Sequence, residues 1–123
     1  MSSSHSGEAE LEVALVGYGL AGRVFHAPFL RDHPRMRLGT IVTGSPERAE
    51  AARRENPSAR IVAGIEDIGD DARLVVVATP PARHLDQVLA VLRPGRSVLV
   101  DKPFMPDEAA AARAIREADR VGA

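Results

Sequence analysis

Residues 11–22 read Leu-Glu-Val-Ala-Leu-Val-Gly-Tyr-Gly-Leu-Ala-Gly, an apolar run followed by three glycines at the spacing G-x-G-x-x-G. The apolar run predicts a buried strand, and the residues after it predict a helix that opens at the third glycine. Gly17 permits a tight turn out of the strand, Gly19 lets a pyrophosphate approach the backbone, and Gly22 lets the helix pack closely on the sheet. The stretch therefore predicts a Rossmann-type turn that binds the pyrophosphate of a dinucleotide.

The residues between these glycines belong to the same turn, so we expect Tyr18, Leu20 and Ala21 to contact the cofactor as well. Tyr18 is expected to flank the pyrophosphate through its backbone rather than through its hydroxyl. A tight turn without a ligand is the alternative interpretation. Three glycines in register, directly after a strand and before a helix, favour the binding turn.

The rest of the chain alternates between apolar runs and helical patterns. A continuous run such as Leu74–Ala78 indicates a strand that is buried on both faces, as in a parallel sheet covered by helices. The sequence therefore predicts an α/β fold with a doubly wound parallel sheet in three α/β/α layers. The expected strands are Leu11–Val16, Arg37–Val42, Arg60–Val62, Arg73–Ala78 and Ser97–Val100. The expected helical segments are Gly22–Asp32, Pro46–Glu55, a short turn near Gly64–Ile68, Pro81–Leu92 and Pro106–Val121.

The 123 residues suffice for one domain, which we expect over residues 11–123 after a polar, flexible tail at residues 1–10. A net charge of -1 gives no electrostatic reason to expect nucleic acid or a membrane surface as a partner. The absence of cysteine excludes disulfides, thiolate metal sites and a cysteine nucleophile, and no metal site is expected. Without a signal peptide or an apolar run of about 18 residues, we expect a cytoplasmic protein.

The end of the second expected strand bears on the choice of dinucleotide. In NAD-binding domains an acidic residue about 20 positions after the glycine turn accepts the ribose hydroxyls. Here Thr43, Gly44 and Ser45 stand at that place, so no carboxylate is available to bind a 2′-hydroxyl or to repel a 2′-phosphate. Arg48 follows in the first turn of the next helix and can supply a positive charge. This pattern favours NADP over NAD, with a polar strand end capped by Ser45 as the alternative.

Three motifs occur in a characteristic order: Gly17 to Pro28 (GYGLAGRVFHAP), Ala78 to His84 (ATPPARH) and Asp101 to Phe104 (DKPF). Together they resemble the N-terminal domain of the Gfo/Idh/MocA oxidoreductases, and the resemblance covers nearly all of residues 11–123. It implies a nicotinamide-dependent dehydrogenase or reductase that acts on a sugar, polyol or related hydroxyl or carbonyl compound.

The resemblance implies a catalytic role for Lys102, which matches the lysine of the family's Glu-Lys-Pro motif. The lysine would hydrogen-bond the reacting oxygen of the substrate beside the nicotinamide, where an ammonium group stabilises a developing alkoxide. Asp101 replaces the usual glutamate with a shorter carboxylate and is also expected to contact the cofactor. Pro103 would shape the turn that directs Lys102 into the cleft, with a cis bond as one way to form it.

The resemblance also implies that Thr79 and Pro80 line the cofactor near the ribose on the nicotinamide side. The family often has Asn where Pro81 stands, so any contact by that side chain is lost. His84 matches a common family histidine and is expected either to face the cofactor or to be a buried, hydrogen-bonded structural residue. For His26, a capping or packing role is expected rather than a catalytic one.

Enzymes of this family have a second, largely antiparallel domain that supplies most substrate contacts. We therefore expect the chain to be a fragment that binds the dinucleotide but does not turn over substrate efficiently alone. The longer form is expected to be a homo-oligomer formed through that domain. A nucleotide-binding sensor without chemistry is the alternative, and Lys102 argues against it. A domain that binds S-adenosylmethionine is a third interpretation, disfavoured because no acidic residue follows the second strand.

Overall fold

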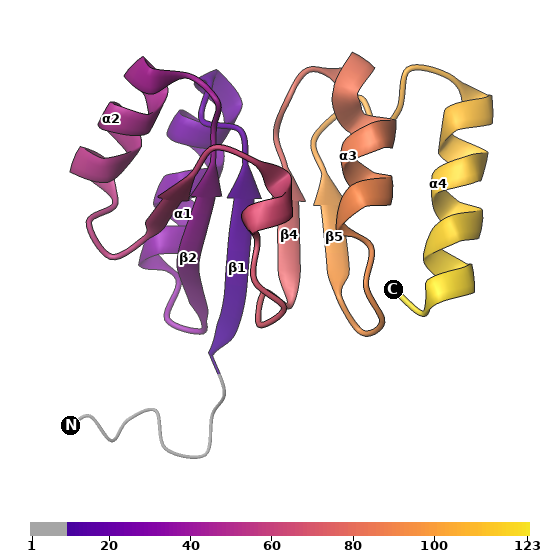
Figure 1. The fold of residues 1–123 in the computed structure, drawn as a ribbon, viewed down its shortest axis with the longest axis horizontal. Coiled ribbons are helices and arrows are strands. Elements are labelled where there is room, and N and C mark those ends of the chain that lie inside the picture. Colours follow the sequence, from indigo (N-terminus) through magenta and orange to yellow (C-terminus); the bar gives the residue numbers. More distant parts are fainter. Residues whose placement is uncertain (1–9) are drawn as a thin grey trace.

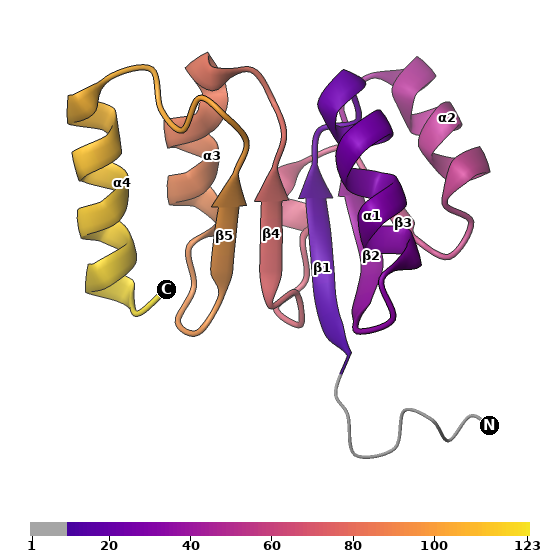
Figure 2. The ribbon, with the colours of Figure 1, turned by 180° about the vertical axis from the view of Figure 1, so that it is seen from behind.

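The computed structural model describes residues 10–123 and contains a five-stranded parallel sheet between two layers of helices (Figures 1 and 2). The strands lie in the order β3-β2-β1-β4-β5, so the chain builds one side of the sheet outward from β1 and then the other. This reversal beside β1 places a crevice at the carboxyl ends of the strands, where open α/β sheets bind ligands. The strands are β1 Leu11–Val16, β2 Met36–Val42, β3 Arg60–Val62, β4 Leu74–Val77 and β5 Ser97–Val100.

Helices cover both faces of the sheet, as the two clusters of buried side chains show. Residues of α1 (Ala27–Asp32) and α2 (Pro46–Glu55) share one cluster, and residues of α3 (His84–Val91) and α4 (Glu108–Val121) share the other. Figure 2 shows α1 in front of the sheet, on the face opposite α3. The short helical segments are η2 Ala21–His26, η3 Ile65–Asp67 and η4 Pro81–Arg83.

The central strand β1 shows why its sequence is continuously apolar. Val13 and Leu15 belong to the cluster under α1 and α2, whereas Ala14 and Val16 belong to the cluster under α3 and α4. All four side chains are at most 2% exposed. The prediction of a doubly wound parallel sheet buried on both faces is therefore confirmed.

The first helix differs from the single segment predicted over Gly22–Asp32. A π-helix spans Ala21–His26, and a regular α-helix begins only at Ala27. Pro28 explains the change, because proline has no N–H to donate to the carbonyl four residues earlier and its ring collides with that carbonyl. The π-helix therefore overlaps the end of the glycine motif and stops two residues before the proline. Single π-helical turns are frequent at functional sites.

Two other predicted helices begin later than expected. Asp107 caps α4 by accepting a 2.8 Å hydrogen bond from the backbone N–H of Ala110, so the helix starts at Glu108 rather than at Pro106. The segment predicted over Pro81–Leu92 opens with the 3₁₀ turn η4 and becomes α3 at His84. The tail predicted over residues 1–10 lies, apart from Glu10, outside the described residues.

Candidate functional site

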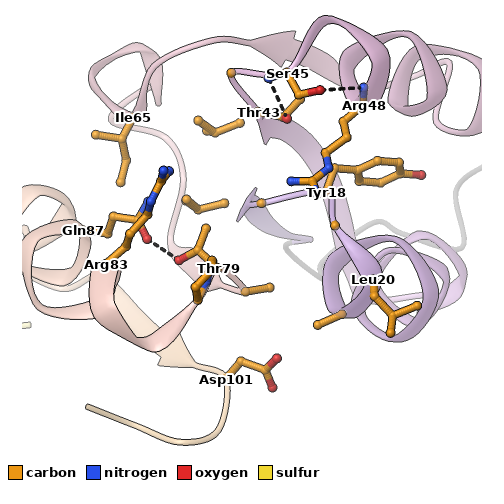
Figure 3. Close-up of a pocket in the computed structure, with 18 of the residues that line it drawn as sticks. Tyr18, Leu20, Thr43, Ser45, Arg48, Ile65, Thr79, Arg83, Gln87 and Asp101 are labelled. Atoms are coloured by element: carbon orange, nitrogen blue, oxygen red, sulfur yellow. Dashed lines mark hydrogen bonds between the residues drawn. The ribbon is translucent and has the colours of Figure 1, made fainter. Parts of the chain in front are cut away.

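A cavity of about 900 Å³ lies at the carboxyl ends of β1, β2, β3 and β4 and reaches the loop after β5 (Figure 3). This is the crevice that the strand order predicts. It gathers residues from every βα connection of the sheet, so segments far apart in the sequence share one wall. The lining comprises Val16, Gly17, Tyr18, Gly19, Leu20, Ala21, Val42, Thr43, Gly44, Ser45, Arg48, Ala63, Ile65, Ala78, Thr79, Pro80, Arg83, Gln87 and Asp101.

Two of the three motif glycines are required by the turn itself. Gly17 has φ of +104°, and a Cβ there would lie 2.9 Å from the carbonyl oxygen of Ala78. A Cβ on Gly22 would lie 2.1 Å from the carbonyl oxygen of Gly17, well inside any allowed contact. Gly22 is buried beneath the pocket and is the one residue of the predicted turn that does not line it.

Gly19 is different, because the three atoms nearest to an added Cβ all belong to a side chain and none to the backbone. Those contacts are guanidinium atoms of Arg48, at 3.6 and 3.7 Å. The fold alone therefore tolerates a side chain at this position. The space above Gly19 is the space that a pyrophosphate needs in this kind of turn.

Tyr18 anchors the glycine turn from behind. Its ring is 2% exposed, its hydroxyl donates to Oε1 of Glu55 at 2.6 Å, and the same hydroxyl accepts from the Asn56 amide at 2.9 Å. Arg23 donates three hydrogen bonds of 2.9, 3.2 and 2.6 Å to the Glu55 carboxylate. This pairing, with the Tyr18 hydrogen bond, lowers the pKa of Glu55 to about 2, while burial and the Glu55 contact raise the pKa of Tyr18. The Tyr18 hydroxyl is thus committed to α2, which leaves its backbone to face the pocket.

The end of β2 forms an open, polar corner of the pocket (Figure 3). Thr43 is buried, and Ser45 caps α2 by accepting a 3.3 Å hydrogen bond from the Arg48 backbone N–H. No atom lies within 4 Å of the position that a Gly44 Cβ would take. No carboxylate belongs to this corner, and the guanidinium of Arg48 forms no hydrogen bond or ion pair with the part of the chain that the structure describes.

The connection after β4 forms the opposite wall. Thr79 and Pro80 line the pocket as expected, and the Thr79 hydroxyl donates a short hydrogen bond to the side-chain oxygen of Gln87. Arg83 and Gln87 also line the pocket, and Ile65 does so from the connection after β3. No role was expected for these three residues, although Arg83 lies within the motif Ala78 to His84. The only sequence signal for Arg83 and Gln87 was their place in the first turns of the helix after a pocket strand.

Of the two roles expected for His84, the structure agrees with that of a buried, hydrogen-bonded residue. The side chain is completely buried and does not line the pocket. Its Nδ1 lies 2.9 Å from the carbonyl oxygen of Phe104, and its Nε2 lies 2.6 Å from that of Thr79. The imidazole therefore links the end of β4 to the segment that follows β5.

The segment after β5 carries the expected catalytic residue. Asp101 lines the pocket, whereas Lys102 is exposed next to it, outside the lining, and its bond to Pro103 is cis. The Asp101 carboxylate lies 3.5 Å from Nε2 of His26 at the end of the π-helix. His26, expected only to cap or pack, thus lies beside the acidic residue that precedes the lysine.

No group of three or more histidine, aspartate or glutamate side chains in residues 10–123 is placed to hold a metal ion. No helix in the same range has the length and apolar character needed to cross a bilayer.

Comparison with known proteins identifies the family. The sequence model of the family described as "Oxidoreductase family, NAD-binding Rossmann fold" (GFO_IDH_MocA) matches residues 11–123. The chain is 32% identical over 114 residues to "scyllo-inositol 2-dehydrogenase (NADP(+)) IolW" of Bacillus subtilis, a match that covers 91% of this chain and 31% of that protein.

Solved structures give the same result. The WlbA dehydrogenase from Bordetella pertussis, in complex with NADH and UDP-GlcNAcA, superposes with a TM-score of 0.85 at 27% identity, over 93% of this chain and 33% of that one. The 3-ketoreductase KijD10 from Actinomadura kijaniata, in complex with TDP-benzene and NADP, gives a TM-score of 0.81 at 25% identity, over 92% and 36%. The chain spans about a third of the length of these relatives. It belongs to the Gfo/Idh/MocA oxidoreductase family, of which it contains the NAD-binding Rossmann fold.

Proposed function

We propose that this chain is the cofactor-binding domain of an NAD(P)-dependent oxidoreductase that transfers hydride between a nicotinamide and a sugar-like or polyol-like substrate. The observation that carries the proposal is that the glycine turn and Asp101 line the same pocket. Its volume of about 900 Å³ is within the range of small-molecule and cofactor sites. Relatives named as an inositol dehydrogenase and as a sugar-nucleotide-bound dehydrogenase support the substrate class.

The pocket has a direction that suits a dinucleotide. In this fold the pyrophosphate lies over the glycine turn and the adenosine ribose lies beyond the end of β2. The nicotinamide half then extends the other way, over Thr79 and Pro80 towards Asp101. Gly19 leaves the necessary space above the turn, and the Arg48 guanidinium at its border can neutralise phosphate charge.

In the proposed reaction, the cofactor and the protein have different roles. A bound nicotinamide supplies the group that accepts or donates the hydride. Lys102 follows Asp101 at the nicotinamide end, where its ammonium can donate a hydrogen bond to the substrate oxygen and stabilise negative charge there. Asp101, the residue before this lysine, lines the pocket, and Nε2 of His26 lies 3.5 Å from its carboxylate.

The residues at the end of β2 support NADP as the preferred cofactor. A 2′-phosphate needs space and positive charge, and the corner offers the empty volume at Gly44 and the unpaired guanidinium of Arg48. The hydroxyls of Thr43 and Ser45 add hydrogen-bonding groups at the same place. Among the relatives, one is named for NADP(+) and the structures hold NADP or NADH, so the preference rests on these residues rather than on the family.

Titration of the chain with NADPH and NADH, followed by nicotinamide fluorescence, tests the proposal. We expect saturable binding of both, with NADPH the tighter ligand. Binding of neither would contradict the cofactor site, and tighter binding of NADH would overturn only the preference. A non-catalytic nucleotide sensor is a second candidate, favoured by the exposure of Lys102 outside the pocket lining. Replacement of Lys102 by alanine in the full-length enzyme decides between them, because a sensor would bind its nucleotide unchanged and show no turnover to lose.

A further inference from the structure

Arg83 is a cation of the pocket for which the proposed function has no role. It ends the 3₁₀ turn Pro81–Arg83 and lines the cavity together with Ala63 and Ile65. Figure 3 shows its side chain rising into the cavity beside Ile65, from the wall opposite Arg48. Its guanidinium makes no hydrogen bond or ion pair with any residue in the range 10–123, so it is free to contact a ligand.

The two pocket arginines have different surroundings. The guanidinium of Arg48 lies against Gly19, over the turn that binds pyrophosphate. Arg83 instead lies beside Ile65, and the pocket lining after β3 consists of the apolar residues Ala63 and Ile65. Apolar walls are a poor environment for a phosphate and a good one for a heterocyclic base.

The sheet order places the base at this wall. The ribose of the adenosine lies at the end of β2, and the next strand on that side is β3. A base attached to that ribose extends from the corner at Thr43 towards the residues after β3. Ala63 and Ile65 line the pocket in that region, and Figure 3 shows the Arg83 side chain beside Ile65.

The pocket has no aromatic ring available for stacking. Tyr18 is the only aromatic residue in the lining, and its ring is 2% exposed with its hydroxyl bound to Glu55 and Asn56. A planar guanidinium can take the place of a ring, because arginine stacks on aromatic faces through dispersion and cation–π attraction. We propose that Arg83 stacks on the adenine of the dinucleotide and that Ala63 and Ile65 form the apolar wall beside it. This inference rests on the proposed cofactor site and adds the residue that recognises the base.

Two substitutions separate stacking from charge. Arg83→Ala removes both the plane and the charge, whereas Arg83→Lys keeps the charge and loses the plane. If the guanidinium stacks on the base, both variants should lose affinity for NADPH and for NADH to the same extent, by about threefold to thirtyfold. This range corresponds to cation–π energies of about 0.6–2 kcal/mol. Arg116→Ala, on the exposed side of α4, is the matched control and should bind as the parent does.

Reduced nicotinamide mononucleotide, which lacks the adenosine, is the ligand control. Its affinity should be the same for the parent, Arg83→Ala and Arg83→Lys, with far-ultraviolet circular dichroism and the melting temperature confirming that each variant is folded. Full binding by Arg83→Lys, a loss confined to NADPH, or an equal loss for the mononucleotide would overturn the stacking role. A parent chain that binds neither NADPH nor NADH would instead contradict the proposed function itself.

Discussion

The two ends of the pocket are built in different ways. At the end of β2, consecutive residues make the corner: Thr43 is buried, Gly44 leaves space and Ser45 caps the helix that carries Arg48. The segment after β5 is exposed from Lys102 to Phe104 and is held by side chains from distant elements, such as His84 on the Phe104 carbonyl. Local sequence thus forms the end of the pocket proposed for the adenosine ribose, whereas tertiary contacts position the end proposed for catalysis.

The largest effect should come from breaking the turn that both ends share. Gly22→Ala places a methyl group 2.1 Å from the Gly17 carbonyl oxygen, a backbone atom that cannot move without displacing the whole turn. We expect a loss of stability of about 1–3 kcal/mol or more, as for other overpacked sites, and no detectable NADPH binding. Urea unfolding and fluorescence titration measure the two quantities.

Gly44→Ala is the matched control, since nothing lies within 4 Å of the added methyl group. Its free energy of unfolding in urea should equal that of the parent to within about 0.5 kcal/mol. If both alanine variants were equally stable and both bound NADPH, the packing role of Gly22 would be wrong.

The catalytic end should respond to the loss of its buried link. His84→Leu removes the ring whose nitrogens lie 2.6 and 2.9 Å from the carbonyl oxygens of Thr79 and Phe104, and a buried carbonyl that loses its donor costs about 1–3 kcal/mol. We expect faster amide hydrogen exchange in residues 101–105 and unchanged exchange in residues 43–48. Equal acceleration at both places would show that His84 supports the whole fold rather than one end.

The cofactor end should respond to charge. Arg48→Ala should weaken NADPH binding by about 10-fold to 100-fold, as expected for a charge-assisted hydrogen bond to a phosphate of about 1.5–3 kcal/mol. The affinity for NADH should change much less, because NADH has a 2′-hydroxyl where NADPH has the 2′-phosphate that Arg48 would bind. Equal losses for the two cofactors in a titration series would place Arg48 on the pyrophosphate rather than on the 2′-phosphate.

The fold class and the residues that line the pocket at the end of β2 could be predicted from the sequence, because their determinants are consecutive. Residues that are neighbours in the chain determine the strand β1 and the glycine turn that follows it. The same holds for the helix cap at Ser45. The pairing of His26 with Asp101 could not be foreseen, because it depends on how a π-helix and the loop after β5 meet in space. Arg83 was missed for a similar reason, since only the packed structure shows that it points into the pocket.

The smallest expected effect concerns the anchor behind the turn. The pKa of Glu55 is held at about 2, so its contribution to stability is complete above its ordinary value of 4.5 and is lost as the pH falls towards 2. The difference in unfolding free energy between the parent and Glu55→Gln should therefore shrink between pH 5 and pH 2. Glu50→Gln, on a more exposed carboxylate of the same helix, should show no such trend. A difference that stays constant with pH would mean that the Arg23–Glu55 contact is not formed in solution.

The empty space at Gly44 has a consequence for how such an enzyme can evolve. Because no atom lies within 4 Å of its Cβ position, this residue can be exchanged without repacking the domain. Gly44→Asp would introduce a carboxylate beside the ribose, which repels a 2′-phosphate and accepts a 2′-hydroxyl. Under the proposed cofactor preference, a single substitution would thus change which nicotinamide cofactor the protein uses, while folding stability and the residues around Lys102 stay as they are.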